Sequence, residues 1–299
     1  MISIHGFSKQ YGDVSAVSDL SLEVERGSIC GLLGPNGAGK TTTFKCLLGF
    51  ARPTSGTILI DGKPLEPATF ERLSYVPERM ALYEWMRVRD LIELQRRSFK
   101  HFDARRASDL IALFRLDPQK RVKRLSKGQQ TAVAIVLAFS IAPSLLILDE
   151  PASGLDPIFQ RVVIDLMIDA AANGATILFS SHQITQVERA ADHVAILRGG
   201  KLVLDGHVDA LKSSEKIVEA IFDHAVPPVD GLATDIRVRR VERSGRILRA
   251  YVHAGSDDIA RRLEELGPRS VTVLDLNLED IFLNAVEAEH IALPQGVLQ

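Results

Sequence analysis

The stretch Gly34-Pro-Asn-Gly-Ala-Gly-Lys-Thr41 decides the fold class of this chain of 299 residues. It matches G-x-x-x-x-G-K-[ST], the P-loop pattern. Glycines let successive backbone N–H groups turn inward around a polyphosphate, and the helix that follows presents its positive N-terminal end. We expect the Lys40 ammonium to reach the β- and γ-phosphates and the Thr41 hydroxyl to help hold Mg²⁺. The nucleotide-binding residues predicted here are Gly34, Pro35, Asn36, Gly37, Ala38, Gly39, Lys40, Thr41 and Thr42.

The residues on either side of the P-loop fit the same interpretation. Ser28–Leu33 is a compact apolar run typical of a buried strand, and residues from Lys40 to about Leu48 have a helical pattern. The alternative is a glycine turn that happens to precede a lysine. A strand before the glycines and a helix after them favour nucleotide binding instead.

A second buried strand ends in two neighbouring carboxylates. Leu145–Leu148 is an unbroken apolar run, and Asp149 and Glu150 follow it directly. Carboxylates at the C-terminal edge of a parallel sheet lie where ligands bind in this fold class. Asp149 would hold Mg²⁺ directly or through water, and Glu150 would polarise the water that attacks the γ-phosphate. The alternative, a strand end capped by acidic surface residues, is disfavoured because the same chain carries a P-loop.

One histidine follows a third apolar strand. Thr176–Phe179 leads into Ser180-Ser181-His182, and a lone histidine in such a place is more often structural than catalytic. The fold class nevertheless puts this strand end on the same edge of the sheet as Lys40 and Asp149. An imidazole there could hydrogen-bond to the terminal phosphate, which makes His182 a candidate catalytic residue.

Composition and charge exclude several classes of protein. Hydrophobic residues make up 46% and charged residues 25%, which is ordinary for a globular protein. The 36 Lys and Arg against 38 Asp and Glu give a net charge of −2, so no nucleic-acid partner is expected. Cys30 and Cys46 lack metal-ligand spacing and are expected to be reduced core thiols. The most apolar region, Thr131–Leu148, is interrupted by polar residues and a proline, so no membrane span is predicted.

The pattern along the chain predicts an α/β fold with a mainly parallel core sheet, followed by a small α+β domain. Residues 1–25 alternate as short strands, 85–139 are mostly helical, and 158–172 form a crossover helix. The predicted boundaries are 1–213, with a helical subdomain at about 79–140, and 214–299. In the second part we expect strands at Ile217–Phe222, Ile236–Val241, Ile247–Val252 and Val271–Leu276, and helices at Asp257–Leu266 and about Leu278–Ala288.

Further motifs resemble those of one family. Leu125-Ser-Lys-Gly-Gln-Gln130 resembles the LSGGQ signature of ATP-binding cassette (ABC) ATPases, and Pro151-Ala-Ser-Gly-Leu-Asp156 resembles their D-loop. His182 falls where that family has its switch histidine, and Tyr11 looks like the aromatic residue that stacks on adenine. These matches follow the family's order over residues 1–213. The resemblance implies a P-loop ATPase with an N-terminal antiparallel β subdomain and a helical subdomain, which binds ATP and Mg²⁺.

The resemblance also implies how the site is completed. In this family the P-loop of one subunit faces the signature of another, so that two ATP molecules are enclosed in a head-to-tail dimer of identical or related chains. The signature and D-loop residues expected at nucleotide are Ser126, Lys127, Gly128, Gln129 and Asp156. ATP binding would close the dimer, and hydrolysis would open it again.

In transporters of this family, that motion passes to an integral-membrane permease subunit. Such a partner would hold the chain on the cytoplasmic side, peripheral to the inner face of the cell membrane. Met80–Met86 is a candidate contact with it, although the stretch could equally belong to the core of the helical subdomain.

Two positions depart from the family's pattern. The third signature residue is Lys127 instead of the common glycine, and Tyr75-Val-Pro-Glu78 carries a glutamate where the Q-loop usually supplies a glutamine. Glu78 adds charge beside an anionic nucleotide; it could bind Mg²⁺, which would offset the repulsion, or face the coupling surface. These features and Leu278-Glu-Asp-Ile-Phe282 look most like the ATPase subunits of bacterial ABC-2-type exporters.

We therefore expect an ATP-hydrolysing transporter subunit. The alternative is a soluble ABC ATPase acting on ribosomes or DNA, and the single cassette and slightly acidic balance disfavour it. A third possibility, a nucleotide sensor without activity, is disfavoured by the intact Lys40, Thr41, Asp149, Glu150 and His182.

Overall fold

The computed structural model describes residues 1–214, 216–229 and 231–282. It divides the chain into two compact units, Met1–Asp205 and Gly206–Gln299. The division falls earlier than the expected boundary after residue 213, so that helix α7 (Val208–Ser214) groups with the second unit.

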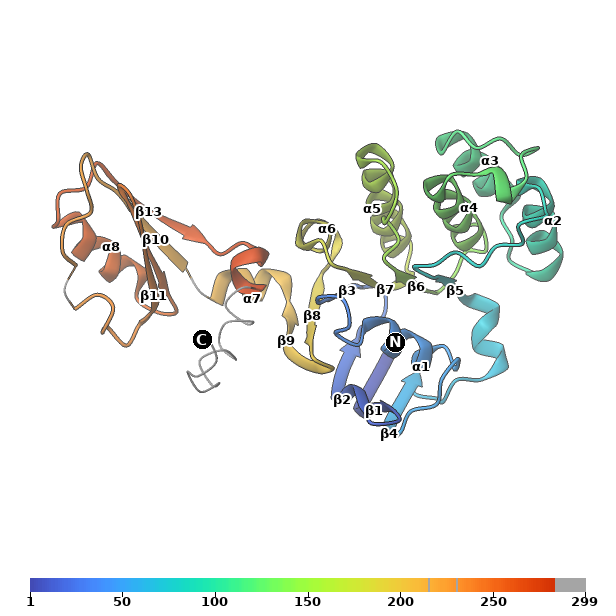
Figure 1. Ribbon diagram of the computed structural model, residues 1–299, viewed down its shortest axis with the longest axis horizontal. Coiled ribbons are helices and arrows are strands. Elements are labelled where there is room, and N and C mark those ends of the chain that lie inside the picture. The colour runs from blue at the N-terminus through green and yellow to red at the C-terminus, as the bar shows by residue number, and fades with distance from the viewer. Residues whose placement is uncertain (215, 230, 283–299) are drawn as a thin grey trace. The chain divides into compact units, whose positions relative to one another are not determined.

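A six-stranded sheet forms the centre of the first unit (Figure 1), with strand order β5-β6-β7-β3-β8-β9. β3 pairs in parallel with β7 and β8, and β6 pairs in parallel with β5 and β7. Because β3, β6 and β7 are buried along their whole lengths, their sequences are mostly apolar, with polar residues only at the ends of β6 and β7. The predicted parallel core is confirmed. The strands are β3 (Ile29–Leu33), β5 (Leu73–Val76), β6 (Leu145–Asp149), β7 (Thr176–Ser181), β8 (His193–Arg198) and β9 (Lys201–His207).

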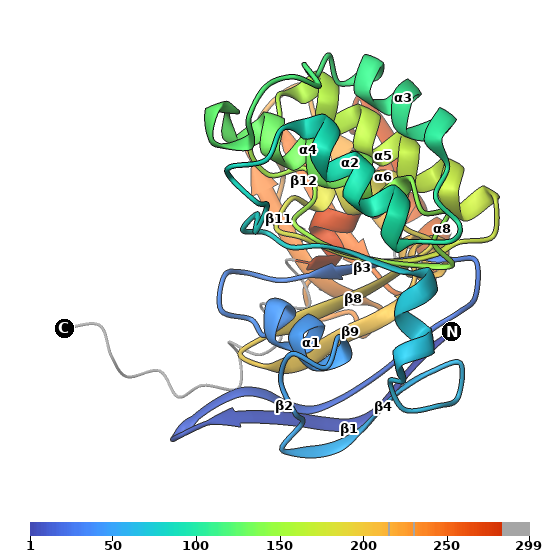
Figure 2. The same ribbon diagram turned by 90° about the vertical axis from the view of Figure 1, so that its right-hand side faces the viewer.

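Helices cover one face of this sheet, and α1 lies on the other (Figures 1 and 2). Helix α5 connects β6 to β7, which confirms the predicted crossover. Helix α6 follows β7 and was not predicted, because its seven residues are too few to show a helical period. The helices are α1 (Lys40–Leu47), α2 (Val88–Ser98), α3 (Ala104–Leu113), α4 (Lys127–Phe139), α5 (Pro157–Ala172) and α6 (Ile184–Ala190), with 3₁₀ turns η1 (Pro67–Arg72) and η2 (Val122–Arg124).

A three-stranded antiparallel sheet packs beneath α1, in the order β2-β1-β4. Ile2, Ile4 and Phe7 of β1 are fully buried and share a core cluster with Phe44 of α1. The alternation of buried and exposed side chains along β1 shifts by one residue, because a bulge breaks the pairing register of β1 with β2 between Ile4 and Phe7. The predicted N-terminal β subdomain is thus present. Its strands are β1 (Ile2–Tyr11), β2 (Val14–Val24) and β4 (Ser55–Ile60).

The two cysteines lie in the interior of the first unit as free thiols. Cys30 is fully buried in β3, and burial raises the pKa of its thiol. Burial also raises the pKa of Cys46 in α1. A raised pKa keeps each thiol in its unreactive protonated form.

The second unit is an antiparallel sheet in the order β11-β12-β10-β13, with helix α8 (Ser256–Glu264) against one face. Ile259 and Leu263 of α8 are buried in one cluster with Val218 and Leu248 of the sheet. The alternation of the strands and the helical spacing of Ile259 and Leu263 account for this core. The strands are β10 (Lys216–Ile221), β11 (Val238–Ser244), β12 (Ile247–Val252) and β13 (Ser270–Asp275).

Two predicted elements of this unit differ from the structure. The strand expected at Ile236–Val241 begins at Val238, because the Asp235 carboxylate accepts a hydrogen bond from the Arg237 N–H (3.0 Å) and turns the chain there. Ile236 is consequently 89% exposed. Residues 278–282 are helical, and the remainder of the helix predicted at 278–288 lies outside the described residues.

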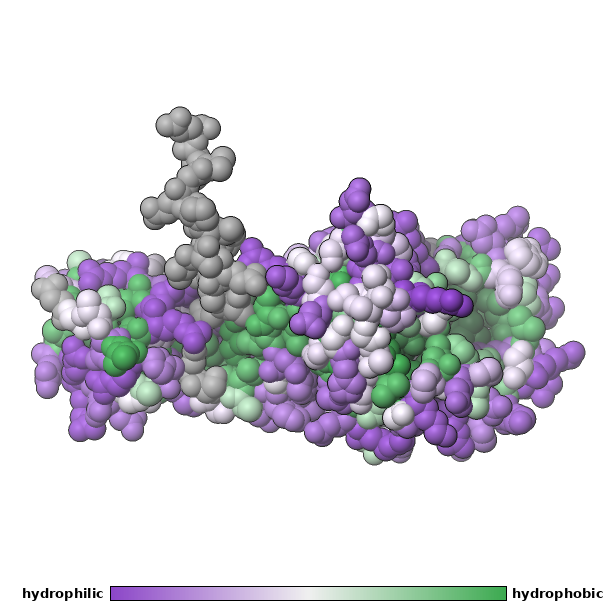
Figure 3. All heavy atoms as spheres, turned by 90° about the horizontal axis from the view of Figure 1, so that it is seen from below, coloured by the Kyte–Doolittle hydropathy of each residue, from purple (hydrophilic) through white to green (hydrophobic). Residues whose placement is uncertain are grey.

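Hydrophobic and hydrophilic residues are interspersed on the face seen in Figure 3. Within the described part of the chain, no helix has both the length and the apolar character needed to cross a membrane.

Candidate nucleotide site

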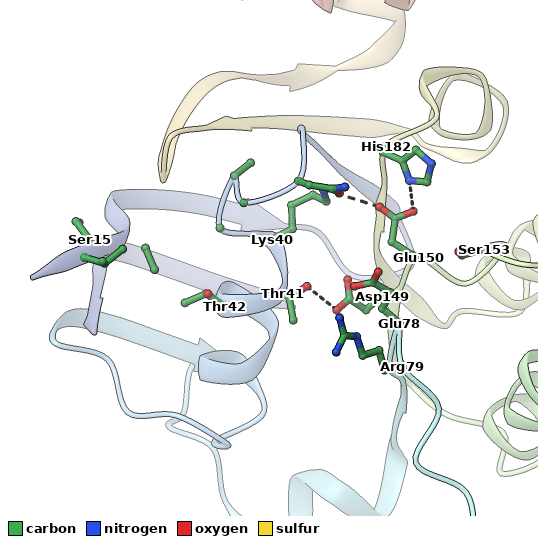
Figure 4. Close-up of a pocket in the computed structure, with 16 residues that line it drawn as sticks. Ser15, Lys40, Thr41, Thr42, Glu78, Arg79, Asp149, Glu150, Ser153 and His182 are labelled. Carbon is green, nitrogen blue, oxygen red and sulfur yellow. Dashed lines mark hydrogen bonds and ion pairs between the residues drawn. The ribbon is translucent and has the colours of Figure 1, made fainter. Parts of the chain in front are cut away.

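One cavity of about 670 Å³ lies in the first unit, within the size range of small-ligand sites. The P-loop, the ends of β6 and β7, the loop after β5 and the β1–β2 hairpin contribute to its wall (Figure 4). The lining residues are Val14, Ser15, Ala16, Asn36, Gly37, Ala38, Gly39, Lys40, Thr41, Thr42, Glu78, Arg79, Asp149, Glu150, Ser153 and His182.

The P-loop needs glycine at the position just before α1. Gly39 has a φ of 106°, and a Cβ atom there would lie 2.7 Å from the carbonyl oxygen of Ala16. Only glycine adopts this conformation and tolerates this approach. The tight turn delivers the first N–H groups of α1, which have no partners within the helix, to the wall of the cavity.

Lys40 is held inside the loop at only 6% exposure. Its Nζ donates to the carbonyl oxygens of Gly34 (2.6 Å) and Pro35 (3.3 Å) and lies 3.9 Å from Oε1 of Glu150. A buried ammonium costs free energy unless acceptors surround it, and these three groups provide them. The Lys40 ammonium is therefore held at the position where a polyphosphate would bind.

Asp149 ends β6 with its two carboxylate oxygens engaged on opposite sides. Oδ2 accepts from the Thr41 hydroxyl (2.9 Å), and Oδ1 accepts from the Ser180 hydroxyl of β7 (2.6 Å). Asp149 is 1% exposed, so its charge depends on these donors. The structure thus joins the P-loop to the strand end, as the sequence predicted.

Glu150 and His182 form a pair at the mouth of the cavity. The Glu150 carboxylate is about one-tenth exposed, and its Oε2 lies 2.8 Å from Nδ1 of His182 (Figure 4). The imidazole is half exposed. A carboxylate between an ammonium and an imidazole can accept a proton from water, whereas Asp149 is occupied by hydroxyl donors. The structure therefore brings together all three predicted catalytic residues, Lys40, Glu150 and His182.

Glu78 lies on the loop after β5 and lines the cavity, exposed to solvent beside Arg79. Burial and the negative charges of Asp149 and Glu78 raise the pKa of the Tyr75 phenol to about 12. The departure from glutamine therefore adds a carboxylate to a wall that already holds two. Arg79, which the sequence reasoning did not select, brings a cation to the same wall.

The signature segment does not reach this cavity. Ser126 caps α4: its hydroxyl accepts from the Gln129 N–H, and the Gln129 Oε1 accepts from the Ser126 N–H, both at 3.2 Å. A Cβ on Gly128 would lie 2.7 Å from the Gly154 carbonyl oxygen. The positions of serine, glycine and glutamine in the signature thus have local structural reasons: the cap of α4 and the close approach to Gly154. Ser126 and Lys127 are exposed.

Two more predicted residues lie outside the cavity wall. Asp156 caps α5, accepting from the N–H groups of Ile158 and Phe159 at 3.0 Å. Tyr11 ends β1, is 47% exposed and has the Lys9 ammonium 4.6 Å from its ring centroid. Its contact with adenine stays a prediction.

Sequence reasoning did not select Ser180, although its hydroxyl bonds to the Asp149 carboxylate and to the Glu150 N–H. The signal was the Ser-Ser-His run, of which only the histidine was selected. Choosing Ser180 requires the register that sets it opposite Asp149, and that register follows from the sheet order. Val14–Ala16, Arg79 and Ser153 were missed for the same reason, because tertiary packing brings them to the wall.

A parallel sheet whose P-loop, strand-end carboxylates and histidine meet at one cavity defines a P-loop nucleoside triphosphatase. Within that class, residues 17–153 match the family described as ABC transporter. The chain is 32% identical over 300 residues to "Nod factor export ATP-binding protein I" of Cupriavidus pinatubonensis, a match that covers 97% of this chain and 91% of that relative. The chain belongs to this family of ABC transporter ATP-binding proteins, and it binds and hydrolyses ATP.

Two further likenesses support this membership. The chain is 29% identical over 286 residues to "ABC transporter ATP-binding protein YtrB" of Bacillus subtilis (strain 168), covering 95% of this chain and 97% of that one. A solved structure described as the ATP-binding subunit of an ABC transporter is 32% identical, with a TM-score of 0.66, over 71% of this chain and 92% of that chain. The expected family and fold are confirmed.

Proposed function

We propose that this chain is the ATPase subunit of an exporter, in which two subunits enclose each nucleotide head to tail. One observation carries the proposal: the signature Ser126–Gln129 lies at the start of α4 with Ser126 and Lys127 exposed, outside the cavity that holds Lys40 and Glu150. The family resemblance assigns both sets of residues to the same nucleotide. A second subunit, identical or related, would supply the signature that is missing from the cavity wall.

The local geometry of the signature supports this assignment. The Ser126 cap and the close approach of Gly128 to Gly154 hold the first turn of α4 in a fixed conformation. The exposed Lys127 adds a positive charge there, where helix N–H groups already favour an anion. A preformed, exposed surface of this kind suits the phosphates of a nucleotide held by the partner.

Mg²⁺ would bind between Thr41 and Asp149. Both offer the oxygen ligands that this ion prefers. Asp149 Oδ1 is held by Ser180, so Oδ2 is the oxygen directed toward the Thr41 hydroxyl. Glu78 lines the same cavity and is a third candidate ligand. When bound, the ion would neutralise charge on the phosphates, which the three carboxylates of this wall otherwise repel.

A separate membrane-spanning protein would form the transport path and hold the chain at the inner face of the membrane. The stretch Met80–Met86 supports this partner because Tyr83 is 49% and Trp85 68% exposed, with ring centroids 5.2 Å apart. Next to it lies a groove of about 290 Å³, lined by Tyr75, Leu82 and other largely apolar residues. An exposed aromatic pair beside an apolar groove suits an apolar segment of a partner.

Export is favoured over a role on ribosomes or DNA because the full-length relatives reported above carry transporter names. One of them, at 32% identity, is named for export of Nod factor. An ABC-2-type exporter, in which a separate permease works with two ATPase subunits, fits these observations.

Coexpression with a candidate permease, a membrane protein from a neighbouring reading frame, tests the proposal. We expect the pair to purify together, with ATPase activity that the membrane protein stimulates. Trp85→Glu should abolish copurification and leave ATP binding intact. Leu113→Glu, at an exposed apolar position on α3 that lines neither cavity nor groove, should copurify normally. Equal behaviour of the two variants would contradict the proposed docking surface.

A further inference from the structure

One buried hydroxyl on β7 connects the Asp149 carboxylate to the backbone of Glu150. Ser180 is 0% exposed and stands opposite Asp149 in the parallel pairing of β6 and β7. Its Oγ donates to Oδ1 of Asp149 (2.6 Å) and accepts from the backbone N–H of Glu150 (3.0 Å). A serine hydroxyl has one proton to donate, so its only donor is committed to the carboxylate.

The hydrogen bond from the Glu150 N–H to Ser180 involves an unusual backbone conformation. Glu150 has a φ of 51°, in the left-handed region that non-glycine residues adopt infrequently. Such a conformation persists where surrounding contacts hold it, and it is enriched at functional sites. The N–H that bonds to Ser180 belongs to this residue, directly after the strand ends. Ser180 therefore fixes the peptide from which the Glu150 side chain projects.

We propose that Ser180 is a positioning residue for ATP hydrolysis. It turns Asp149 so that Oδ2 faces Thr41, and it holds the Glu150 backbone in its left-handed conformation. His182, two residues further along, bonds to the Glu150 carboxylate. The end of β7 thus holds Glu150 at two points, its peptide and its carboxylate.

Loss of the hydroxyl should affect hydrolysis much more than nucleotide binding. Without Ser180 Oγ, the Asp149 Oδ1 and the Glu150 N–H would be left without their partners in the interior. The Asp149 carboxylate would be free to rotate, and the backbone from which the Glu150 side chain projects would no longer be held in place. The bonds from Lys40 to the carbonyl oxygens of Gly34 and Pro35 involve none of these atoms, so the P-loop should remain formed.

The test compares Ser180→Ala with a matched control in the full-length chain. Ser140→Ala removes another serine that is 0% exposed, whose hydroxyl donates to the Val136 carbonyl oxygen at the end of α4 (2.5 Å). Ser180→Cys keeps the size of the side chain and weakens the donor, and Ser180→Thr keeps the hydroxyl. For each variant, one measures kcat, KM, the Mg²⁺ concentration for half-maximal activity, ATP affinity with and without Mg²⁺, and Tm.

We expect Ser180→Ala to lower kcat by about 10- to 100-fold and to raise the Mg²⁺ requirement, because small displacements of reacting groups cost this much. ATP affinity without Mg²⁺ should stay within about threefold of the unmodified chain. Ser180→Thr should restore much of kcat, and Ser140→Ala should lower Tm with kcat unchanged. If Ser180→Ala does not fold, Ser180→Cys should show the same loss of kcat at a nearly normal Tm.

Three results would overturn the proposal. One is a kcat within about twofold of the unmodified chain in Ser180→Ala, or in Ser180→Cys if the alanine variant does not fold. Another is a joint fall of kcat and metal-free ATP affinity, which would show general collapse of the site. The third is an equal loss of kcat in Ser140→Ala. The measurement needs only the ATPase activity, so its outcome is independent of the proposed membrane partner.

Discussion

The two units of this chain use polar side chains in opposite ways. In the first unit, Lys40, Asp149 and Glu150 are buried beside one another, and Ser180 bonds to the Asp149 carboxylate and the Glu150 backbone. In the second unit, charged residues pair nearer the surface, as Arg249 does with Glu219 (2.7 Å). Within the described residues, every buried polar or charged side chain belongs to the first unit. These side chains are Lys40, Thr43, Ser74, Thr131, Ser140, Asp149, Glu150, Thr176, Ser180, Ser181 and Gln186.

This difference shows which unit carries the chemistry. Burying a charge costs several kcal/mol unless partners replace the lost water, so a cluster of buried charges persists where function requires it. Partly exposed pairs such as Glu219–Arg249 cost little and contribute little. The second unit is accordingly an ordinary α+β domain, an antiparallel sheet with a helix on one face, and we expect it to affect stability or regulation while the first unit hydrolyses ATP.

The comparison is tested most severely by removing one carboxylate from each unit. Glu150→Gln should lower kcat by about 10²- to 10⁴-fold, because the amide cannot accept the proton from water. Glu219→Gln in the second unit should leave kcat nearly unchanged. Steady-state ATPase assays with nucleotide-binding measurements check both. A large loss in Glu219→Gln would break the comparison.

Removal of core volume from the second unit should separate the stabilities of the two units. Ile259 is 0% exposed beneath the sheet, so Ile259→Ala should cost about 2–5 kcal/mol of that unit's free energy of unfolding. The thermal transition of the second unit should fall in calorimetry, with ATP binding by the first retained. A uniform fall of a single transition would show that the units unfold together.

One lysine from each unit sharpens the comparison further: Lys40 is the first residue of α1, and Lys216 is the first residue of β10. Lys40→Met should weaken ATP binding by about 10- to 100-fold, the loss expected for a hydrogen bond to a charged group. Lys216→Met removes the cation that pairs with Asp275 in the second unit and should leave ATP binding unchanged. Titration with a fluorescent nucleotide distinguishes them. Equal losses would contradict the assignment of the site.

A smaller effect is expected from pH in the second unit. Hydrogen bonds from Arg237, with the nearby charge of Arg262, hold the pKa of Asp235 below its ordinary value near 4. A lowered pKa in the folded state stabilises the protein above about pH 4, and the contribution is lost as pH falls below that value. From about pH 6 to pH 3, the Tm difference between the unmodified chain and Asp235→Asn should therefore stay constant at first and shrink once the pH falls below about 4. A difference that is constant over this range would contradict the assignment.

The elements predicted best from the sequence are those whose pattern lies entirely within one short segment of the chain. The strands at 29–33, 145–149 and 176–181 have continuous apolar stretches, such as 145–148 and 177–179, because the sheet is covered on both faces. The P-loop contains its own glycines and its own lysine. Neither feature depends on which strands are neighbours in the sheet.

What the sequence could not predict depends on neighbours that are distant along the chain. Ser180 bonds to Asp149 across 31 residues, a relation set by the order β6-β7-β3. Helix α6 is too short for its period to be read, and Asp235 turns the chain three residues before β11 begins. The signature was recognised by resemblance, and its exposed position outside the cavity became visible only in the folded chain.

The most direct test of the account is whether ATP joins two copies of the chain. Glu150→Gln should bind Mg-ATP without hydrolysing it, and sedimentation velocity should then show a dimer with ATP and a single chain with ADP. Adding Ser126→Arg, which places a bulky side chain at the exposed signature, should keep the ATP-bound variant as a single chain. If Glu150→Gln remains a single chain at saturating Mg-ATP, alone and beside its membrane partner, the shared nucleotide site is contradicted.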